Sequence, residues 1–179
     1  MTERAAPVAT VRELDADAYR AAIPDLSRLV VDAVESGAGV NFLAGVTAGE
    51  AGAWWAERIE LVADGTISPF AAFDGDELVG SALMIRSRNA NSPHRAEVGK
   101  VLVHRSARRR GIGAALMGAV EDRARADGRW LLILDTVTGS AAEAMYRALG
   151  WTELGVMPNH ALLPDGTPAA TTYFWKDLR

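Results

Sequence analysis

The stretch at residues 101–114 constrains the fold of this chain more than any other segment. It begins as an apolar strand, passes through a basic turn with Gly111 and Gly113, and continues as an amphipathic helix. Every fourth residue forms the apolar stripe of that helix, namely Ile112, Leu116, Val120 and Ala124. Because a strand that leads directly into a helix is typical of α/β folds, we expect a sheet with helices packed on it.

The turn itself, which we call the basic loop (residues 108–113), has the chemistry of an anion site. Glycine lets a backbone approach a ligand closely, and N–H groups at a helix start attract negative charge. Arg108, Arg109 and Arg110 add positive charge there. A dinucleotide fingerprint would need glycine where Leu116 stands, and the Gly-Lys-Ser/Thr run of a P-loop is missing from the sequence. The alternative interpretation is a solvated basic turn that caps a core helix.

Periodicity and turn signals predict the other elements. We expect helices at 26–34, with Pro24 in the first turn, and from the capping box Thr47-x-x-Glu50 to Val62. A third helix should follow the capping box Ser140-x-x-Glu143 and end at Gly150. Strands are expected at 70–73, 78–85, 96–103, 130–134, 151–156 and 171–176, with 130–134 covered on both faces and residues 97, 99, 101 and 103 sharing one side. This order predicts one α/β domain, residues 1–179, with a mixed sheet.

Composition narrows the function. With 49% hydrophobic residues the chain is not disordered, and its net charge of −4 argues against a nucleic-acid partner. It has no cysteine, which excludes a disulfide, a thiolate nucleophile and a Cys-ligated metal. Its 3 histidines lack metal-ligand spacing, so no metal is expected. The sequence shows no secretory signal and no run long enough to span a bilayer, so we expect a cytoplasmic protein without a membrane partner.

The Arg-x-x-Gly-x-Gly pattern of the basic loop resembles the acyl-CoA pyrophosphate loop of the GNAT N-acetyltransferases. The block at residues 134–151, with Tyr146 and Gly150-Trp151, resembles a later motif of the same family. The runs 94–103, 135–143 and 164–166 look like the tabtoxin-resistance acetyltransferases within it. The resemblance covers nearly the whole chain. It implies the GNAT fold, acetyl-CoA as donor and a small-molecule amine as acceptor.

The resemblance also implies a set of site residues. Tyr146 would protonate the leaving thiolate, although a tyrosine here is also typical of helix packing. Glu97 and Asp135 match proposed acid/base residues, with Glu97 as base or substrate anchor. Alternatively, Glu97 pairs with Arg95 or a cross-strand arginine, and Asp135 caps a turn. The backbone near Val103 would bind the thioester oxygen. The full cofactor-binding set is Val101, Leu102, Val103, Arg108, Arg109, Arg110, Gly111, Ile112, Gly113, Ala114, Ser140 and Tyr146.

The acceptor site is expected to contain Glu97, Asp135, Asn41, Phe42, Trp54 and His160. Asn41 stands where the subgroup has a small residue. Ser140 either contacts CoA or serves as a helix cap alone. Trp54 and Trp55 point about 100° apart on a helix, so they cannot both face the same core patch. One could line the acceptor site; the alternative is packing in the core or at the surface. His160 would lie at its rim.

These observations predict direct acetyl transfer in a ternary complex, since no cysteine can carry the acetyl group. The acceptor would be an amino-acid-like antibiotic or metabolite, with a role in resistance or detoxification. Two alternatives remain at this point. The first is a protein or peptide N-terminal acetyltransferase, with a groove between residues 37–45 and the final hairpin. The second is a non-catalytic CoA-binding module; the chain could be a monomer or a homodimer.

Overall fold

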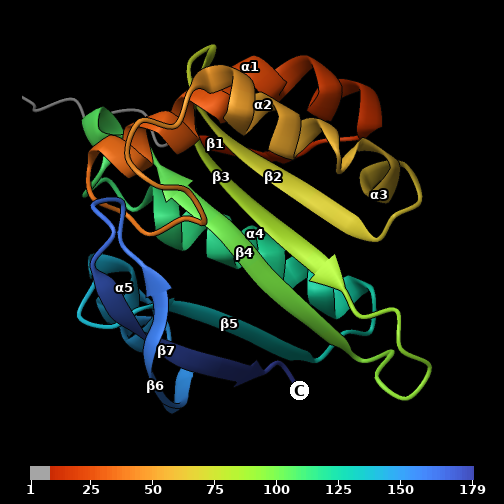
Figure 1. The fold of residues 1–179 in the computed structure, drawn as a ribbon. Coiled ribbons are helices and arrows are strands. Elements are labelled where there is room, and N and C mark those ends of the chain that lie inside the picture. Colours follow the sequence, from red (N-terminus) through yellow and green to blue (C-terminus); the bar gives the residue numbers. More distant parts are fainter. Residues whose placement is uncertain (1–8) are drawn as a thin grey trace, which may run out of the picture.

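The computed structural model describes residues 9–179, and the strands of this part form one seven-stranded mixed sheet (Figure 1). The strand order is β1-β2-β3-β4-β5-β7-β6, in which β4 and β5 are parallel and all other neighbours antiparallel. The strands are β1 (Thr10–Glu13), β2 (Ile67–Asp74), β3 (Glu77–Arg86), β4 (Arg95–Val103), β5 (Leu131–Val137), β6 (Thr152–Leu162) and β7 (Pro168–Asp177). The predicted mixed α/β sheet is therefore confirmed.

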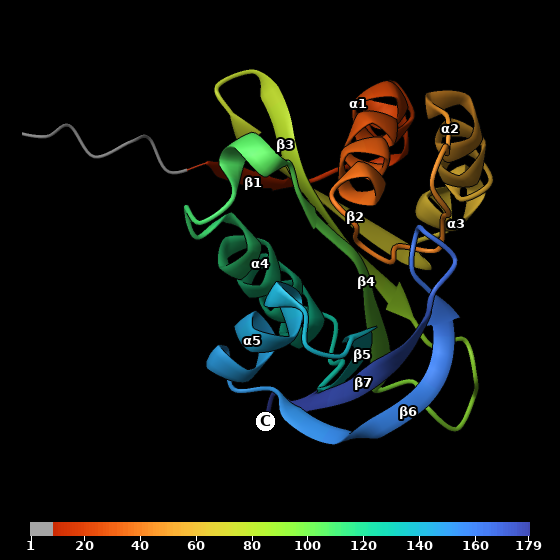
Figure 2. The ribbon, with the colours of Figure 1, turned by 60° about the vertical axis from the view of Figure 1, so that its left-hand side comes forward.

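Helices cover both faces of the sheet (Figure 2). On one face lie α1 (Ala16–Glu35), α2 (Ala48–Ala56) and α3 (Ile59–Ala63), and on the other α4 (Ile112–Ala126) and α5 (Ala141–Ala148). Each face has its own apolar cluster. The predicted stripe of α4 is buried against the sheet, with Leu116 and Val120 at 0% exposure. The strand-to-helix stretch at residues 101–114 therefore also contributes to the apolar cluster on that face.

The two parallel strands separate along their length. Pairing between β4 and β5 ends at Glu97 and Ile133, although the strands continue to Val103 and Val137. Figure 1 shows them diverging from this point. Beyond it, the backbone edges of β4 and β5 that face each other have no strand partner within residues 9–179. The fold therefore has an opening in the sheet at the carboxyl ends of its parallel strands, where ligands bind in α/β sheets.

A bulge at Lys100 corrects the predicted facing of β4. Residues 100 and 101 of β4 lie opposite only Ala82 of β3, and Lys100 has a φ of 50°. Because the bulge adds one residue, side chains after it change face. Val101 and Val103 pack into the cluster on the α4 side, which also contains Ala96 and Val98. Glu97 alternates with these and lies on the opposite face, so the shared side predicted for 97, 101 and 103 was wrong.

Several boundaries also differ from the predictions. Helix α1 begins at Ala16, capped by Asp15, so Pro24 lies inside the helix rather than in its first turn. The helix predicted to reach Val62 is broken after α2, where the Arg58 side chain donates to the Trp54 carbonyl. Strand β1 was not predicted, and β6 extends to Leu162. In β5, Leu132 and Leu134 are buried but their neighbours are only half-buried, so one face rather than both is fully covered.

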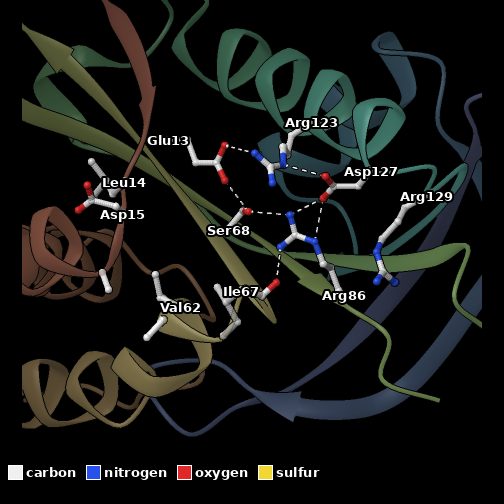
Figure 3. Close-up of a pocket in the computed structure, with 13 residues that line it drawn as sticks. Glu13, Leu14, Asp15, Val62, Ile67, Ser68, Arg86, Arg123, Asp127 and Arg129 are labelled. Atoms are coloured by element: carbon white, nitrogen blue, oxygen red, sulfur yellow. Dashed lines mark hydrogen bonds and ion pairs between the residues drawn. The ribbon is translucent and has the colours of Figure 1, made fainter. Parts of the chain in front are cut away.

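A pocket of about 480 Å³ lies at the opposite end of the sheet, and none of the predicted site residues line it (Figure 3). Four of its charged side chains, those of Glu13, Arg86, Arg123 and Asp127, interact with one another directly or through Ser68. Asp127 accepts from Arg86 at 2.8 Å and pairs with Arg123 at 3.1 Å, and Arg123 also pairs with Glu13. Ser68 bridges Glu13 and Arg86. This network ties α4 to β1, β2 and β3, so we assign it a structural role.

Replacing Asp127 by asparagine should therefore destabilise the protein by about 2 kcal/mol at neutral pH, because two guanidinium partners lose their counter-charge. Burial alone would raise the pKa of Asp127, but hydrogen bonds from Arg86 and Arg123 bring it below its usual value. The contribution is thus present above the pKa of the unfolded chain and is lost as pH falls through the lower folded value. Urea unfolding should show the full difference at pH 7 and a progressively smaller one as pH is lowered below the usual aspartate range. Asp122→Asn, on the exposed side of α4, is the control and should change stability by less than about 0.5 kcal/mol.

Candidate functional site

The basic loop leads into α4 with two residues in left-handed backbone conformations. Gly111 has a φ of 78° and precedes the first helical residue, and Arg109 has a φ of 64°. Ala115 donates its N–H to the Gly111 carbonyl at 3.0 Å. The N–H groups before it belong to the first turn and have no carbonyl four residues earlier in the helix. The loop therefore presents backbone donors at a helix N-terminus, as the sequence predicted.

The three arginines of the basic loop have different surroundings. Arg108 donates from Nε to the Val103 carbonyl at 3.0 Å, and Arg110 pairs with Asp74 at 2.7 Å. Arg109 is exposed and forms no ion pair with any residue from 9 to 179. The structure thus gives Arg108 and Arg110 contacts that hold the loop in place. Arg109 has a charge that is not balanced within the described chain.

Asp32 of α1 fixes the start of this loop, and the sequence did not reveal it. Its carboxylate accepts the backbone N–H of Arg105 at 3.0 Å and lies 3.6 Å from Arg108. His104 approaches the same carboxylate at 3.4 Å. Asp32 stands between Val30 and Ala33 of the apolar stripe of α1, and a charge next to that stripe was the one sequence signal for the buried, paired carboxylate seen in the structure.

Helix α5 packs closely against the start of α4. A Cβ on Gly113 would lie 2.7 Å from Sδ of Met145, so a larger residue here would displace the Met145 side chain. Ser140 caps α5, accepting from the N–H of Glu143 at 3.1 Å, while the Glu143 carboxylate accepts from Gly139 rather than from Ser140. Ser140 also lies 3.3 Å from the Thr136 hydroxyl. Its capping role is therefore confirmed, and α5 is placed beside the β4–β5 opening.

Tyr146 lies in the last turn of α5, with its ring in the core. It is 4% exposed, and its ring centroid lies 6.1 Å from the ring centroids of both Trp151 and Phe174. Its hydroxyl has no hydrogen-bond partner among the described residues. Burial raises the pKa of Tyr146 above its usual value, and the negative charge of Asp135 raises it further. The phenol therefore keeps its proton at physiological pH and can donate it.

Glu97 and Asp135 face the same side of the sheet. Their neighbours Ala96, Val98, Leu132 and Leu134 all belong to the cluster on the α4 side, so the two carboxylates alternate to the other face. Neither forms an ion pair, or a hydrogen bond to a side chain or backbone group, within residues 9–179, which contradicts both the alternative pairing of Glu97 with an arginine and the alternative cap by Asp135. Partial desolvation raises the pKa of Glu97, and Asp135 raises it further. A carboxylate in this state suits proton removal from an amine.

Across the site from these acids lies Trp54. Trp55 is fully buried in the core, whereas Trp54 is half-buried and contacts the ring of Phe42. Lys100 lies 4.5 Å from the Trp54 ring and donates to Asn41 Oδ1 at 2.5 Å. The structure therefore brings Trp54, Phe42 and Asn41 together as predicted. It adds Lys100, to which the sequence assigned no role.

The last hairpin completes the site. Tyr173 of β7 lies opposite Asp135 in the strand register, and its hydroxyl is 3.3 Å from Nε2 of His160. Cross-strand partners present their side chains on one face, so Tyr173, and the His160 ring beside it, lie on the face of Asp135. Ala44 donates its N–H to the Pro164 carbonyl at 2.8 Å, which joins the loop after α1 to the tip of the hairpin (Figure 2). Tyr173 was missed because register cannot be read from the sequence.

Within residues 9–179, no helix is long and apolar enough to cross a membrane. The model of the acetyltransferase (GNAT) family matches residues 42–151. That match includes β4, the basic loop, α4, β5 and α5.

Solved structures share the fold along nearly the whole chain. A phosphinothricin acetyltransferase from Sinorhizobium meliloti, in complex with AcCoA, has a TM-score of 0.78 at 21% identity over 96% of this chain and 89% of its own. A GCN5-related N-acetyltransferase from Kribbella flavida has a TM-score of 0.76 at 22% identity, covering 95% of this chain and 98% of its own. A ribosomal-protein-alanine N-acetyltransferase from Brucella melitensis has a TM-score of 0.72 at 25% identity, covering 94% and 99%.

Proposed function

This chain belongs to the GNAT family of acetyltransferases, and on that premise we propose that it transfers an acetyl group from acetyl-CoA directly to the amine of a small molecule. The observation that carries the proposal is the opening between β4 and β5, beside which α4 begins with the basic loop and α5 carries Tyr146. We further propose that residues 1–179 act as one catalytic domain.

The residues at the opening suit CoA. Donors at the start of α4 and the unbalanced charge of Arg109 match the phosphates, because helix N-termini and guanidinium groups bind such anions. The unpaired backbone edges of β4 and β5 match the amides of its extended arm. Residues 101–103 would line that arm, with 111–114 at the phosphates.

When bound, acetyl-CoA supplies the thioester that the amine attacks. Glu97, assisted by Asp135, removes a proton from the acceptor ammonium so that its nitrogen can react. A backbone N–H of β4 near Val103 stabilises the thioester oxygen. Tyr146 donates its proton to the departing sulfur. Transfer is direct because the chain has no cysteine to hold the acetyl group.

The acceptor we propose is an amino-acid-like antibiotic or metabolite, which would give the enzyme a role in resistance or detoxification. The sequence runs that resemble the tabtoxin-resistance acetyltransferases are the reason for proposing this class, and a phosphinothricin acetyltransferase is among the proteins that share the fold. A peptide acceptor would need a groove between residues 37–45 and the final hairpin. The hydrogen bond from Ala44 to Pro164 joins these two segments, which favours a small acceptor over a peptide.

An acceptor screen with acetyl-CoA tests the proposal by thiol release. Because the chain has no cysteine, a thiol reagent reports only the CoA that is formed. We expect release with small amines, including amino acids and their antibiotic analogues, and none with peptides. Release confined to peptides would establish the protein acetyltransferase instead. CoA binding without any turnover would indicate a binding module, and no CoA binding by calorimetry would contradict the whole proposal.

The basic loop can be tested separately by replacing Gly111 with alanine. Gly111 has a left-handed backbone conformation, in which a Cβ costs about 1–2 kcal/mol. We expect the loop of the variant to relieve this strain by shifting, which displaces the N–H donors at the start of α4. We expect the affinity for CoA to fall about tenfold, since 1.4 kcal/mol corresponds to that factor. Gly128→Ala is the matched control, because Gly128 follows the other end of α4 with a φ of 68°. Equal CoA affinities of the two variants, measured by calorimetry, would show that the loop does not bind the phosphates.

A further inference from the structure

Two cations of the site lie against one indole ring. The guanidinium carbon of Arg58 is 3.3 Å from the centre of the Trp54 ring, and Lys100 Nζ is 4.5 Å from it. Arg58 pairs only with Glu57 among the described residues, at 3.6 Å, and the Glu57 side chain is 74% exposed. Lys100 has no ion pair with the described residues, and its hydrogen bond is to the neutral Asn41 amide. Like charges this close repel each other. No carboxylate of the described residues forms an ion pair with both Arg58 and Lys100.

Lys100 is also held where its backbone is strained. Lys100 has a φ of 50° and Asn41 a φ of 73°, and these two left-handed residues are hydrogen-bonded to each other. The Ser81 hydroxyl fixes the carbonyl of Lys100 at 2.9 Å. Such strain persists where the surroundings demand one conformation, and it is concentrated at ligand sites. The bulge therefore directs a single ammonium group toward Trp54.

The charge of Lys100 persists at neutral pH. Burial lowers its pKa to about 8, with Arg58 lowering it and Asp135 and Glu97 raising it. A group with that pKa is still mostly protonated at pH 7. The site thus has two cations at Trp54 and two unpaired carboxylates on the strands. An acceptor with only an amine would satisfy the carboxylates and leave the cations without a partner.

We propose that Lys100, assisted by Arg58, determines acceptor specificity by binding an acid group of the acceptor while its ammonium lies at Glu97 and Asp135. The inference rests on the proposed acetyltransferase function and names the acceptor as a zwitterion with a carboxylate or a similar acid. Trp54 then provides an apolar wall for both Lys100 and the acceptor. Asn41 orients the ammonium of Lys100 before the acceptor binds.

Matched acceptors test this assignment, namely a panel of L-amino acids and the carboxamide of each. The two members of a pair share the amine but only one has the acid. We expect the wild-type kcat/KM to be at least about tenfold higher for the acid than for the amide, because a charge-assisted hydrogen bond corresponds to such a factor. Lys100→Met should remove this preference by lowering kcat/KM for the acid alone. Lys100→Arg should retain the preference. Equal losses for acid and amide in Lys100→Met would show a merely structural role and overturn the inference.

Binding without turnover separates this inference from the proposed function. N-acetyl-L-amino acids and their amides are titrated into the CoA complex and followed by ligand-observed NMR. The acid should bind more tightly than the amide to the wild type and equally to Lys100→Met. That result without thiol release from any amine would contradict the proposed function alone. Equal binding of acid and amide to the wild type would overturn the role of Lys100.

Discussion

Replacing Tyr146 by phenylalanine is expected to lower kcat about 100-fold while the affinity for CoA stays within about twofold, because a positioned general acid contributes at least that factor. The ring stays packed between Trp151 and Phe174, so only the proton donor is lost. Its hydroxyl has no partner within residues 9–179, so the free energy of unfolding should not change. Steady-state thiol release, calorimetry with CoA and urea unfolding measure the three quantities.

Tyr19→Phe is the control for the loss of a buried hydroxyl. Tyr19 donates to the Trp55 carbonyl at 2.9 Å and lies in the core beneath α2. The change should destabilise the protein by about 1 kcal/mol and leave kcat unchanged. The loss in Tyr146→Phe should be constant between pH 6 and about 9, because burial and Asp135 hold the pKa of Tyr146 above its usual value. Full turnover by Tyr146→Phe would show that another group or water protonates the sulfur.

Features that depend on short stretches of sequence were predictable. The basic loop, the stripe of α4 and the capping box at Thr47 each involve residues within one or two turns, and the structure confirms all three. Glu97 and Asp135 could be placed near each other because each lies on a strand of the same predicted sheet. Their lack of other partners could not be predicted, since it depends on where every arginine of the fold points.

Lys100 illustrates what the sequence could not supply. An alternating strand pattern places Lys100 and Ala96 on one face, but the bulge opposite Ala82 breaks this alternation. The bulge depends on the register with β3, which no local pattern fixes. Asp32 and Tyr173 were missed for a related reason. Asp32 binds Arg105, which is distant in the sequence, and Tyr173 reaches the site only through its register opposite Asp135 of β5. The geometry of the basic loop was thus predictable, and the arrangement around Lys100 was much less so.

The second large effect is expected for Glu97→Gln, which should lower kcat/KM about 50-fold at pH 7, within the range for a lost general base. Glutamine keeps the size of the side chain and removes only its basicity and charge. Asp135→Asn should have a smaller effect, since Glu97 remains. The affinity for CoA should be retained in both variants. Thiol release with a saturating donor gives the rates, and calorimetry gives the affinity.

The pH profile distinguishes a base from a simple anchor for the ammonium. Desolvation and then the charge of Asp135 raise the pKa of Glu97, so wild-type kcat/KM should fall on the acid side at a pH above the usual glutamate range. Removing the charge in Asp135→Asn lowers the pKa of Glu97, so this acid limb should move to lower pH. Glu97→Gln should lose the limb altogether. If the limb stays in place in both variants, another group removes the proton and Glu97 serves only to hold the ammonium.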